Sequence, residues 1–123
     1  MEDMIVKLVV ALEHPAAELR PNGRAHWAVR AREVKRARRI AKLKALAALK
    51  RERPADGAVV RYSIAWFFKG AMPDADNCLA SCKAYLDGVA DALKVDDRVM
   101  ECTGIKRVRD KYAAKTVIIH VTW

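Results

Sequence analysis

The feature that most constrains this chain is a long run, residues 25–51, that contains neither proline nor glycine. The run consists mainly of Ala, Arg, Lys and Leu, which are all strong helix formers. In its second half four apolar residues recur at helical spacing and share one face, namely Ile40, Leu43, Leu46 and Ala47. The sequence therefore predicts one long helix that is apolar along one side.

Segments typical of β-strands lie on both sides of this helix. Residues 4–12 and 59–68 are rich in β-branched or aromatic residues and end at proline, glycine or asparagine-containing loops. Two further strands are expected at about residues 98–108 and 115–123, joined by a turn around Asp110. Four strands in total are therefore expected.

A second helix is predicted between the middle strands. Asp76 or Asn77 can cap its first turn. Apolar residues then follow at alternating spacings of three and four, namely Leu79, Cys82, Leu86, Val89 and Leu93. This amphipathic pattern predicts a helix that buries one side, with Cys82 in the core.

The order of these elements is β-α-β-α-β-β, which indicates an α+β fold with two helices packed on a mixed four-stranded sheet. At 123 residues and 13.8 kDa, residues 1–123 form a single domain without room for a second core. No apolar stretch approaches the roughly 20 residues that cross a bilayer, so no membrane partner is expected. The acidic first residues differ from a signal peptide, and the three cysteines lack a disulfide spacing, so a cytoplasmic location is expected.

The positive charge of the chain is concentrated around the long helix. Residues 20–53 hold 13 Lys or Arg against two acids, a balance of +11, whereas the remaining residues have a balance of −2. This asymmetry favours a polyanionic partner such as DNA, and a merely solvated helix face is the alternative. Trp27 either packs on the sheet or adds a stacking surface. The candidate DNA contacts are Arg24, His26, Arg30, Arg32, Lys35, Arg36, Arg38 and Arg39.

Acidic residues gather at two places in this basic chain. Asp74 and Asp76 precede the second helix, and Asp96 and Asp97 follow it. In an extended segment, side chains two residues apart lie about 7 Å from each other on the same side. Two uncompensated carboxylates there repel each other, and Mg²⁺, or Mn²⁺ as a substitute, would remove the repulsion. The four aspartates are therefore candidate metal ligands, and ordinary caps and turns are the alternative.

Lys83 is a candidate partner of these carboxylates. It lies seven residues after Asp76, so two turns of one continuous helix would place both on the same side. Its ammonium could offset negative charge on a phosphate during hydrolysis. Asp87, four residues further on, could pair with it, and a solvated lysine is the alternative.

The order of these motifs resembles the RusA family of Holliday junction resolvases, which are endodeoxyribonucleases of bacteria and phages. Four segments carry the resemblance: residues 20–27 (RPNGRAHW), 72–77 (MPDADN), 83–89 (KAYLDGV) and 95–98 (VDDR). The resemblance implies a Mg²⁺-dependent active site of three aspartates and a lysine. The matching residues here are Asp74, Asp76, Asp97 and Lys83, with Asp96 as an adjacent acid.

The resemblance also implies a homodimer that resolves four-way DNA junctions in recombination and repair by paired phosphodiester hydrolysis. A two-fold dimer supplies the two related nicks. The aspartates would hold metal that activates a water, and the basic helix would follow the DNA backbone. The alternatives are a non-catalytic nucleic-acid-binding relative and a metal-dependent nuclease that acts on other branched DNA or on RNA.

Overall fold

The computed structural model describes residues 5–21, 26–50 and 52–123. Within these ranges the chain has the predicted α+β fold, built on one four-stranded sheet. The elements in chain order are β1 (Leu8–Glu13), the 3₁₀ helix η1 (Ala17–Leu19), α1 (Trp27–Ala48), β2 (Val60–Phe68), α2 (Ala75–Ser81), α3 (Lys83–Leu93), the 3₁₀ helix η2 (Asp97–Val99), β3 (Met100–Arg109) and β4 (Thr116–Thr122).

The sheet is mixed, as predicted. Its strand order is β1-β4-β2-β3, with β4 antiparallel to both neighbours and β2 parallel to β3. The chain therefore passes the end of β2 on its way from β3 to β4, and the backbone N–H of Asp110 donates to the Phe68 carbonyl there. The Asp110 carboxylate accepts from the N–H groups of Tyr112 and Ala113. The predicted turn around Asp110 is confirmed.

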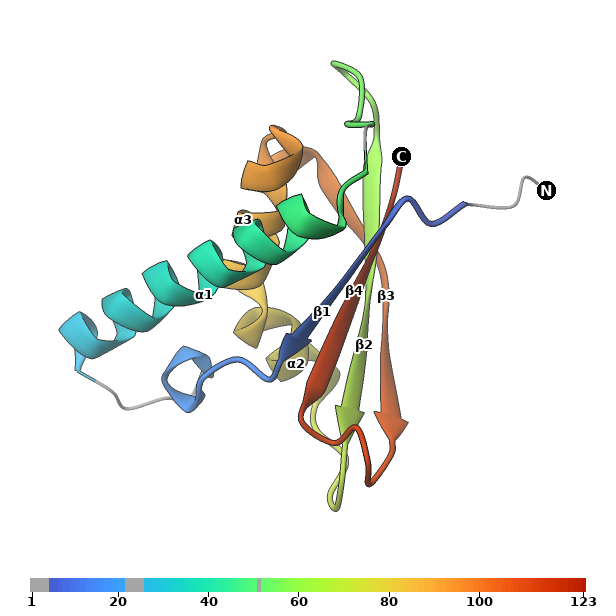
Figure 1. Cartoon of the computed structure of the whole chain (residues 1–123). Coiled ribbons are helices and arrows are strands. Elements are labelled where there is room, and N and C mark those ends of the chain that lie inside the picture. Colours follow the sequence, from blue (N-terminus) through green and yellow to red (C-terminus); the bar gives the residue numbers. More distant parts are fainter. Residues whose placement is uncertain (1–4, 22–25, 51) are drawn as a thin grey trace.

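The core lies between the sheet and the helices, which occupy one side of it (Figure 1). Alternate residues of β1 and β4 are buried on that side, namely Leu8, Val10, Leu12, Val117, Ile119 and Val121. The predicted stripe of the second helix is also inside: Cys82, Leu86, Val89 and Leu93 are buried and Leu79 is half-buried. The stripe and the core position of Cys82 are confirmed.

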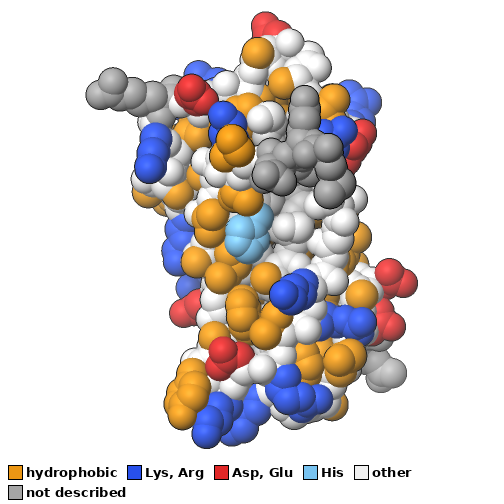
Figure 2. Space-filling view, turned by 90° about the vertical axis from the view of Figure 1, so that its right-hand side faces the viewer, with side chains coloured by type: hydrophobic (Ala, Val, Ile, Leu, Met, Phe, Trp, Pro, Cys, Tyr) orange, Lys and Arg blue, Asp and Glu red, His pale blue; other side chains and the backbone are white. Residues whose placement is uncertain are grey.

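The opposite side of the sheet is covered by no element in the described part of the chain (Figure 1). Figure 2 shows this side, where hydrophobic side chains lie among scattered basic ones. Strand residues that alternate with the buried ones point here. Among them Val9 is 48% exposed, and Phe67 and Ile118 are half-buried.

The second helix differs from its prediction because it is two helices. α2 ends at Ser81, and Cys82, with φ −89° and ψ 1°, separates it from α3. The backbone N–H of Cys82 donates to the Leu79 carbonyl, a tighter bond than an α-helix makes. Lys83 therefore opens α3 instead of extending the helix of Asp76, so the continuous-helix geometry expected for the two is wrong.

The apolar face predicted for α1 is also wrong. Ile40, Leu43 and Leu46 are 36%, 55% and 38% exposed, while the buried side of α1 is formed by Ala37, Ala41 and Ala45. The reason is the close approach of α3: a Cβ placed on Gly88 would lie 2.2 Å from the Arg38 carbonyl oxygen. Only small residues fit at this crossing, so helix–helix packing determines the rotation of α1.

The length and hydropathy of the helices can also be compared with those that a membrane-spanning helix needs. Among residues 5–21, 26–50 and 52–123, no helix is both long enough and apolar enough to cross a membrane. α1 is 22 residues long but carries Arg and Lys throughout.

Candidate functional site

Asp74 caps α2. Its Oδ1 accepts hydrogen bonds from the N–H groups of Asp76 at 2.8 Å and Asn77 at 3.2 Å. The extended backbone of Asp74 (φ −71°, ψ 133°) is typical of an N-cap. Asp76 is exposed in the first turn, where a negative charge suits the helix dipole. The Asp-x-Asp-Asn motif therefore has a structural role, and it leaves Oδ2 of Asp74 and the carboxylate of Asp76 outside the cap.

Lys83 joins two of the motif segments. Its Nζ lies 2.8 Å from Asp87 Oδ1 and 2.5 Å from Asp97 Oδ2. The hydrogen bonds to Asp87 and Asp97 raise the pKa of the ammonium, which therefore stays charged at neutral pH. The predicted Lys83–Asp87 pair is confirmed, and the fold adds Asp97, fourteen residues away in sequence.

Acidic side chains near the end of α3 and directly after it lie close to basic side chains. Asp96 caps η2 by accepting from the Arg98 N–H, and its Oδ2 lies 2.8 Å from Arg98 Nη2. These bonds hold the pKa of Asp96 well below its usual range. Arg38 binds Asp91 with two hydrogen bonds of 2.6 and 2.8 Å. A hollow of about 360 Å³ is lined by Arg38, Asp87, Ala90, Asp91, Val95, Asp96 and Asp97.

The candidate metal ligands form two groups. Asp74 and Asp76 lie at the start of α2, while Asp96 and Asp97 lie at η2. Among the described residues no hydrogen bond joins the groups, and no three His, Cys, Asp or Glu side chains are arranged to hold a metal ion. The donor type fits Mg²⁺, which prefers carboxylate oxygens. Lys83 occupies Oδ2 of Asp97, so a metal that bound this oxygen would compete with the lysine.

Half of the eight candidate DNA contacts lie on the solvent-facing side of α1. Arg32, Lys35, Arg36 and Arg39 are exposed and lie opposite the alanines that face α3. Together they form a basic surface about two turns long, which we call the basic face of α1. Positive charge arranged along one side of a helix suits contact with DNA phosphates.

The remaining candidates have other contacts. Arg30 donates to the carbonyls of Glu18 and Arg20, which ties α1 to η1. His26 caps α1, because its Nδ1 accepts from the Ala28 N–H. Arg24 lies outside the described residues. Trp27 is 76% exposed, so its indole does not pack on the sheet.

Arg38 and Arg39 allow a matched test of whether residues on the basic face of α1 contact DNA while Arg38 stabilises the fold. Arg38→Ala should cost about 1 kcal/mol of stability, because it removes a bidentate ion pair that is partly exposed. Arg39→Ala should leave the melting temperature unchanged and reduce the slope of log affinity against log salt by about one. Thermal unfolding and DNA titrations at several salt concentrations measure both effects. Equal losses of DNA affinity with both melting temperatures unchanged would contradict these separate roles.

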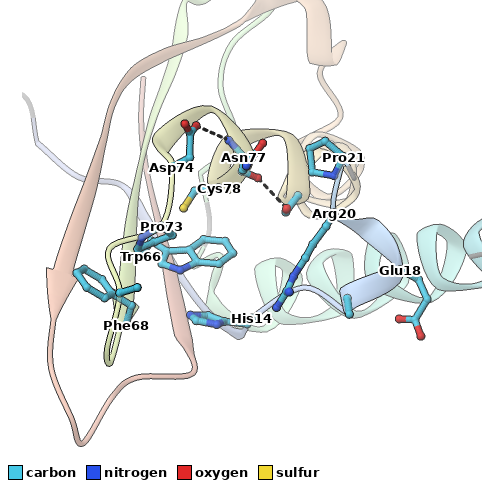
Figure 3. Close-up of a pocket in the computed structure, with 13 residues that line it drawn as sticks. His14, Glu18, Arg20, Pro21, Trp66, Phe68, Pro73, Asp74, Asn77 and Cys78 are labelled. Atoms are coloured by element: carbon cyan, nitrogen blue, oxygen red, sulfur yellow. Dashed lines mark hydrogen bonds between the residues drawn. The ribbon is translucent and has the colours of Figure 1, made fainter. Parts of the chain in front are cut away.

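One feature of the fold was not predicted from the sequence. A hollow of about 740 Å³ lies beside Asp74, between η1, the end of β2 and the start of α2 (Figure 3). His14 and Trp66 stack on one side of it, with ring centres 4.3 Å apart. The two residues are 52 positions apart. His14 directly follows β1 and Trp66 lies in β2, and these strands are not neighbours in the sheet, so no local spacing could have revealed the pair.

Comparisons with known proteins give little information on function. No model of a known protein family matches the chain. A protein of Xylella fastidiosa, described only as uncharacterized, is 38% identical over 91 residues, which are 72% of this chain and 60% of that protein. The chain thus spans less than two thirds of this relative's length. The crystal structure of E. coli HypE, a hydrogenase maturation protein, aligns with 94% of this chain and 30% of its own at 15% identity, but the TM-score of 0.29 is too low to support an argument.

Proposed function

We propose that this protein is a Mg²⁺-dependent endodeoxyribonuclease of the RusA kind that resolves four-way DNA junctions. The observation that carries the proposal is the contact of Lys83 with Asp97. It unites the lysine and one aspartate of a four-residue set that the family resemblance implies, although they come from separate segments. A lysine beside a carboxylate is an arrangement that can offset phosphate charge.

The basic face of α1 supports DNA as the substrate. Its arginines and lysine project to solvent as one surface, and phosphate contacts of this kind position a duplex without reading its sequence. Junction resolution needs two nicks related by a two-fold axis, so we propose that the protein acts as a homodimer. We further propose that it acts in the cytoplasm, where Cys78, Cys82 and Cys102, which form no disulfide in the structure, would stay reduced.

In this proposal Asp74, Asp76 and Asp97 would hold the metal, with Asp96 as an adjacent acid, and the group at the start of α2 and the group at η2 would have to approach each other around it. When bound, the metal lowers the pKa of a water and stabilises charge on the phosphate. The protein's own residues perform the other tasks. Asp74 fixes the start of α2 through its cap, and Lys83 holds Asp97 in place and presents a positive charge beside it.

A second candidate function is supported by the ion pairs. Asp91, Asp96 and Asp97 each contact a cation, respectively Arg38, Arg98 and Lys83. Carboxylates compensated in this way do not require a metal, as in a non-catalytic DNA-binding relative. That protein would bind junctions through the basic face of α1 and cut nothing.

Cleavage of a labelled four-way junction with and without Mg²⁺ tests the proposal. We expect symmetric nicks only when Mg²⁺ or Mn²⁺ is present, and much slower cutting of a linear duplex of equal length. Mg²⁺ should also raise the melting temperature of the free protein, because a ligand that binds only the folded state stabilises it. Equal cutting of both DNAs would indicate a less specific nuclease, and binding without cutting would favour the second candidate.

A further inference from the structure

The hollow beside Asp74 has the form of a small binding site. Trp66, His14 and Phe68 supply an aromatic side, and Asp74 and Asn77 lie on the α2 side (Figure 3). Its volume of about 740 Å³ falls within the range of roughly 300–1,000 Å³ typical of ligand pockets. The site is therefore large enough for a flat aromatic group with a polar edge.

The aromatic side is held in a fixed position. His14 Nε2 lies 2.7 Å from the Phe67 carbonyl and donates to it, and the ring stacks on Trp66 with an angle of 26° between the planes. Burial lowers the pKa of His14, so the imidazole is neutral at physiological pH. The stack therefore offers an uncharged surface on which another ring can lie.

Polar side chains also line the hollow. Asn77 is exposed at the hollow, and its side-chain amide carries both donors and an acceptor. Ser81 donates its hydroxyl to the Asn77 carbonyl and lines the same side. Amide groups of this kind pair with the edges of nucleobases.

Charge near the hollow suits a phosphate chain. Arg20 lines it, and Arg107 donates to the Pro73 carbonyl directly before Asp74. Glu18 and Asp74 are its acidic residues. A strand that carries its phosphates past the arginines would thus bring one base to the aromatic side and one phosphate beside Asp74.

We propose that this hollow receives one unpaired nucleobase of the junction strand that is cut. The inference rests on the proposed function and extends it. Stacking on aromatic side chains is the usual way in which proteins hold unpaired bases. The bases of a four-way junction are paired, so the base would first have to leave its pair, and this costs least where stacking is already interrupted, as at the crossover. The hollow would then supply the sequence preference that the phosphate contacts of α1 cannot.

The fluorescence of Trp66 provides a direct test. A reporter protein with Trp27→Phe and Trp123→Phe keeps Trp66 as its tryptophan. We expect titration with a four-way junction in EDTA to change its emission, and a linear duplex of the same length to leave it unchanged. The reporter keeps every residue that lines the hollow, so it reads the site without altering it.

A second variant fills the hollow from its edge. Ala17 is exposed, lies in η1 and lines the hollow, so Ala17→Phe should occupy part of it without removing core packing. The matched control is Ala80→Phe, an exposed alanine of α2 that does not line the hollow. We expect Ala17→Phe to abolish the emission change, weaken junction binding about tenfold, and flatten the cleavage preference in a pool of junctions with randomised crossover sequence.

The outcomes separate the two proposals. If the wild type neither binds nor cuts the junction, the proposed function fails and the base site fails with it. If the wild type cuts the junction while Trp66 does not respond and Ala17→Phe behaves like Ala80→Phe, the base site is wrong and the nuclease stands. A response of Trp66 that is equal for junction and linear duplex would also overturn the base site.

Discussion

Asp76→Asn is expected to reduce Mg²⁺-dependent junction cleavage at least about a thousandfold, because metal catalysis contributes several kcal/mol to the transition state. Junction binding in EDTA should be retained or become tighter, since one negative charge near the phosphates is lost. The fold should be unaffected: Asp76 is exposed, and none of the described residues donates to its carboxylate. Cleavage rates and binding affinities of the purified variant measure both effects.

The companion substitutions sharpen this experiment. Asp74→Asn keeps an oxygen that can cap α2, because asparagine caps helices as well as aspartate does, so it removes charge while preserving the local structure. Asp56→Asn is the control: it removes an equal charge from an exposed turn outside the candidate site. Undiminished cleavage by Asp76→Asn, or an equal loss in Asp56→Asn, would contradict the assignment of the aspartates.

The strands and the order of elements could be predicted because their signals are local. Residues 115–123 are rich in β-branched residues and predict a strand, and β4 lies there with Val117, Ile119 and Val121 buried. The cap of α2 was predicted only approximately: Asp76 or Asn77 was expected to fill this position, and Asp74, directly before the helix, fills it. The pairing of β4 between β1 and β2 was not predictable, because it depends on contacts between distant segments.

The errors on the helices have a common cause. Periodicity identifies which residues of α1 share a face, but the face that packs is determined by how closely a partner helix approaches. Alanine has a weak hydrophobic signal, so Ala41, fully buried, stood out less than Leu43, which is exposed. The break at Cys82 contains neither proline nor glycine and leaves no mark in the sequence.

The candidate site was predictable only in part for the same reason. The pair Lys83–Asp87 follows from helical spacing, whereas the contact of Lys83 with Asp97 requires the turn after α3. The stack of His14 on Trp66 requires the whole sheet. Sequence motifs therefore suggested the charged candidate residues, and the fold alone revealed the aromatic side of the hollow beside Asp74.

Gly88→Ala is expected to destabilise the protein by about 2–3 kcal/mol, which would lower the melting temperature by about 10 °C. In an exposed helix the same change usually stabilises, by up to about 1 kcal/mol, so the expected sign is reversed here. The added Cβ would lie 2.2 Å from the Arg38 carbonyl oxygen and 3.0 Å from the Lys42 backbone nitrogen. Neither backbone atom can rotate away, so α1 and α3 would have to separate along their contact. Thermal and urea unfolding measure the change.

Gly104→Ala is the matched control for this prediction. Gly104 lies in β3, its φ is not positive, and a Cβ there would meet no atom within 4 Å. The melting temperature of the Gly104→Ala variant should therefore differ from that of the wild type by at most a few degrees. If Gly88→Ala instead raised the melting temperature, α1 would not approach α3 as closely as the structure has it. The rotation of α1 would then be undetermined, and with it the outward direction of Arg32, Lys35, Arg36 and Arg39. The stability of this one variant therefore tests the geometric basis of the proposed DNA contact independently of any DNA experiment.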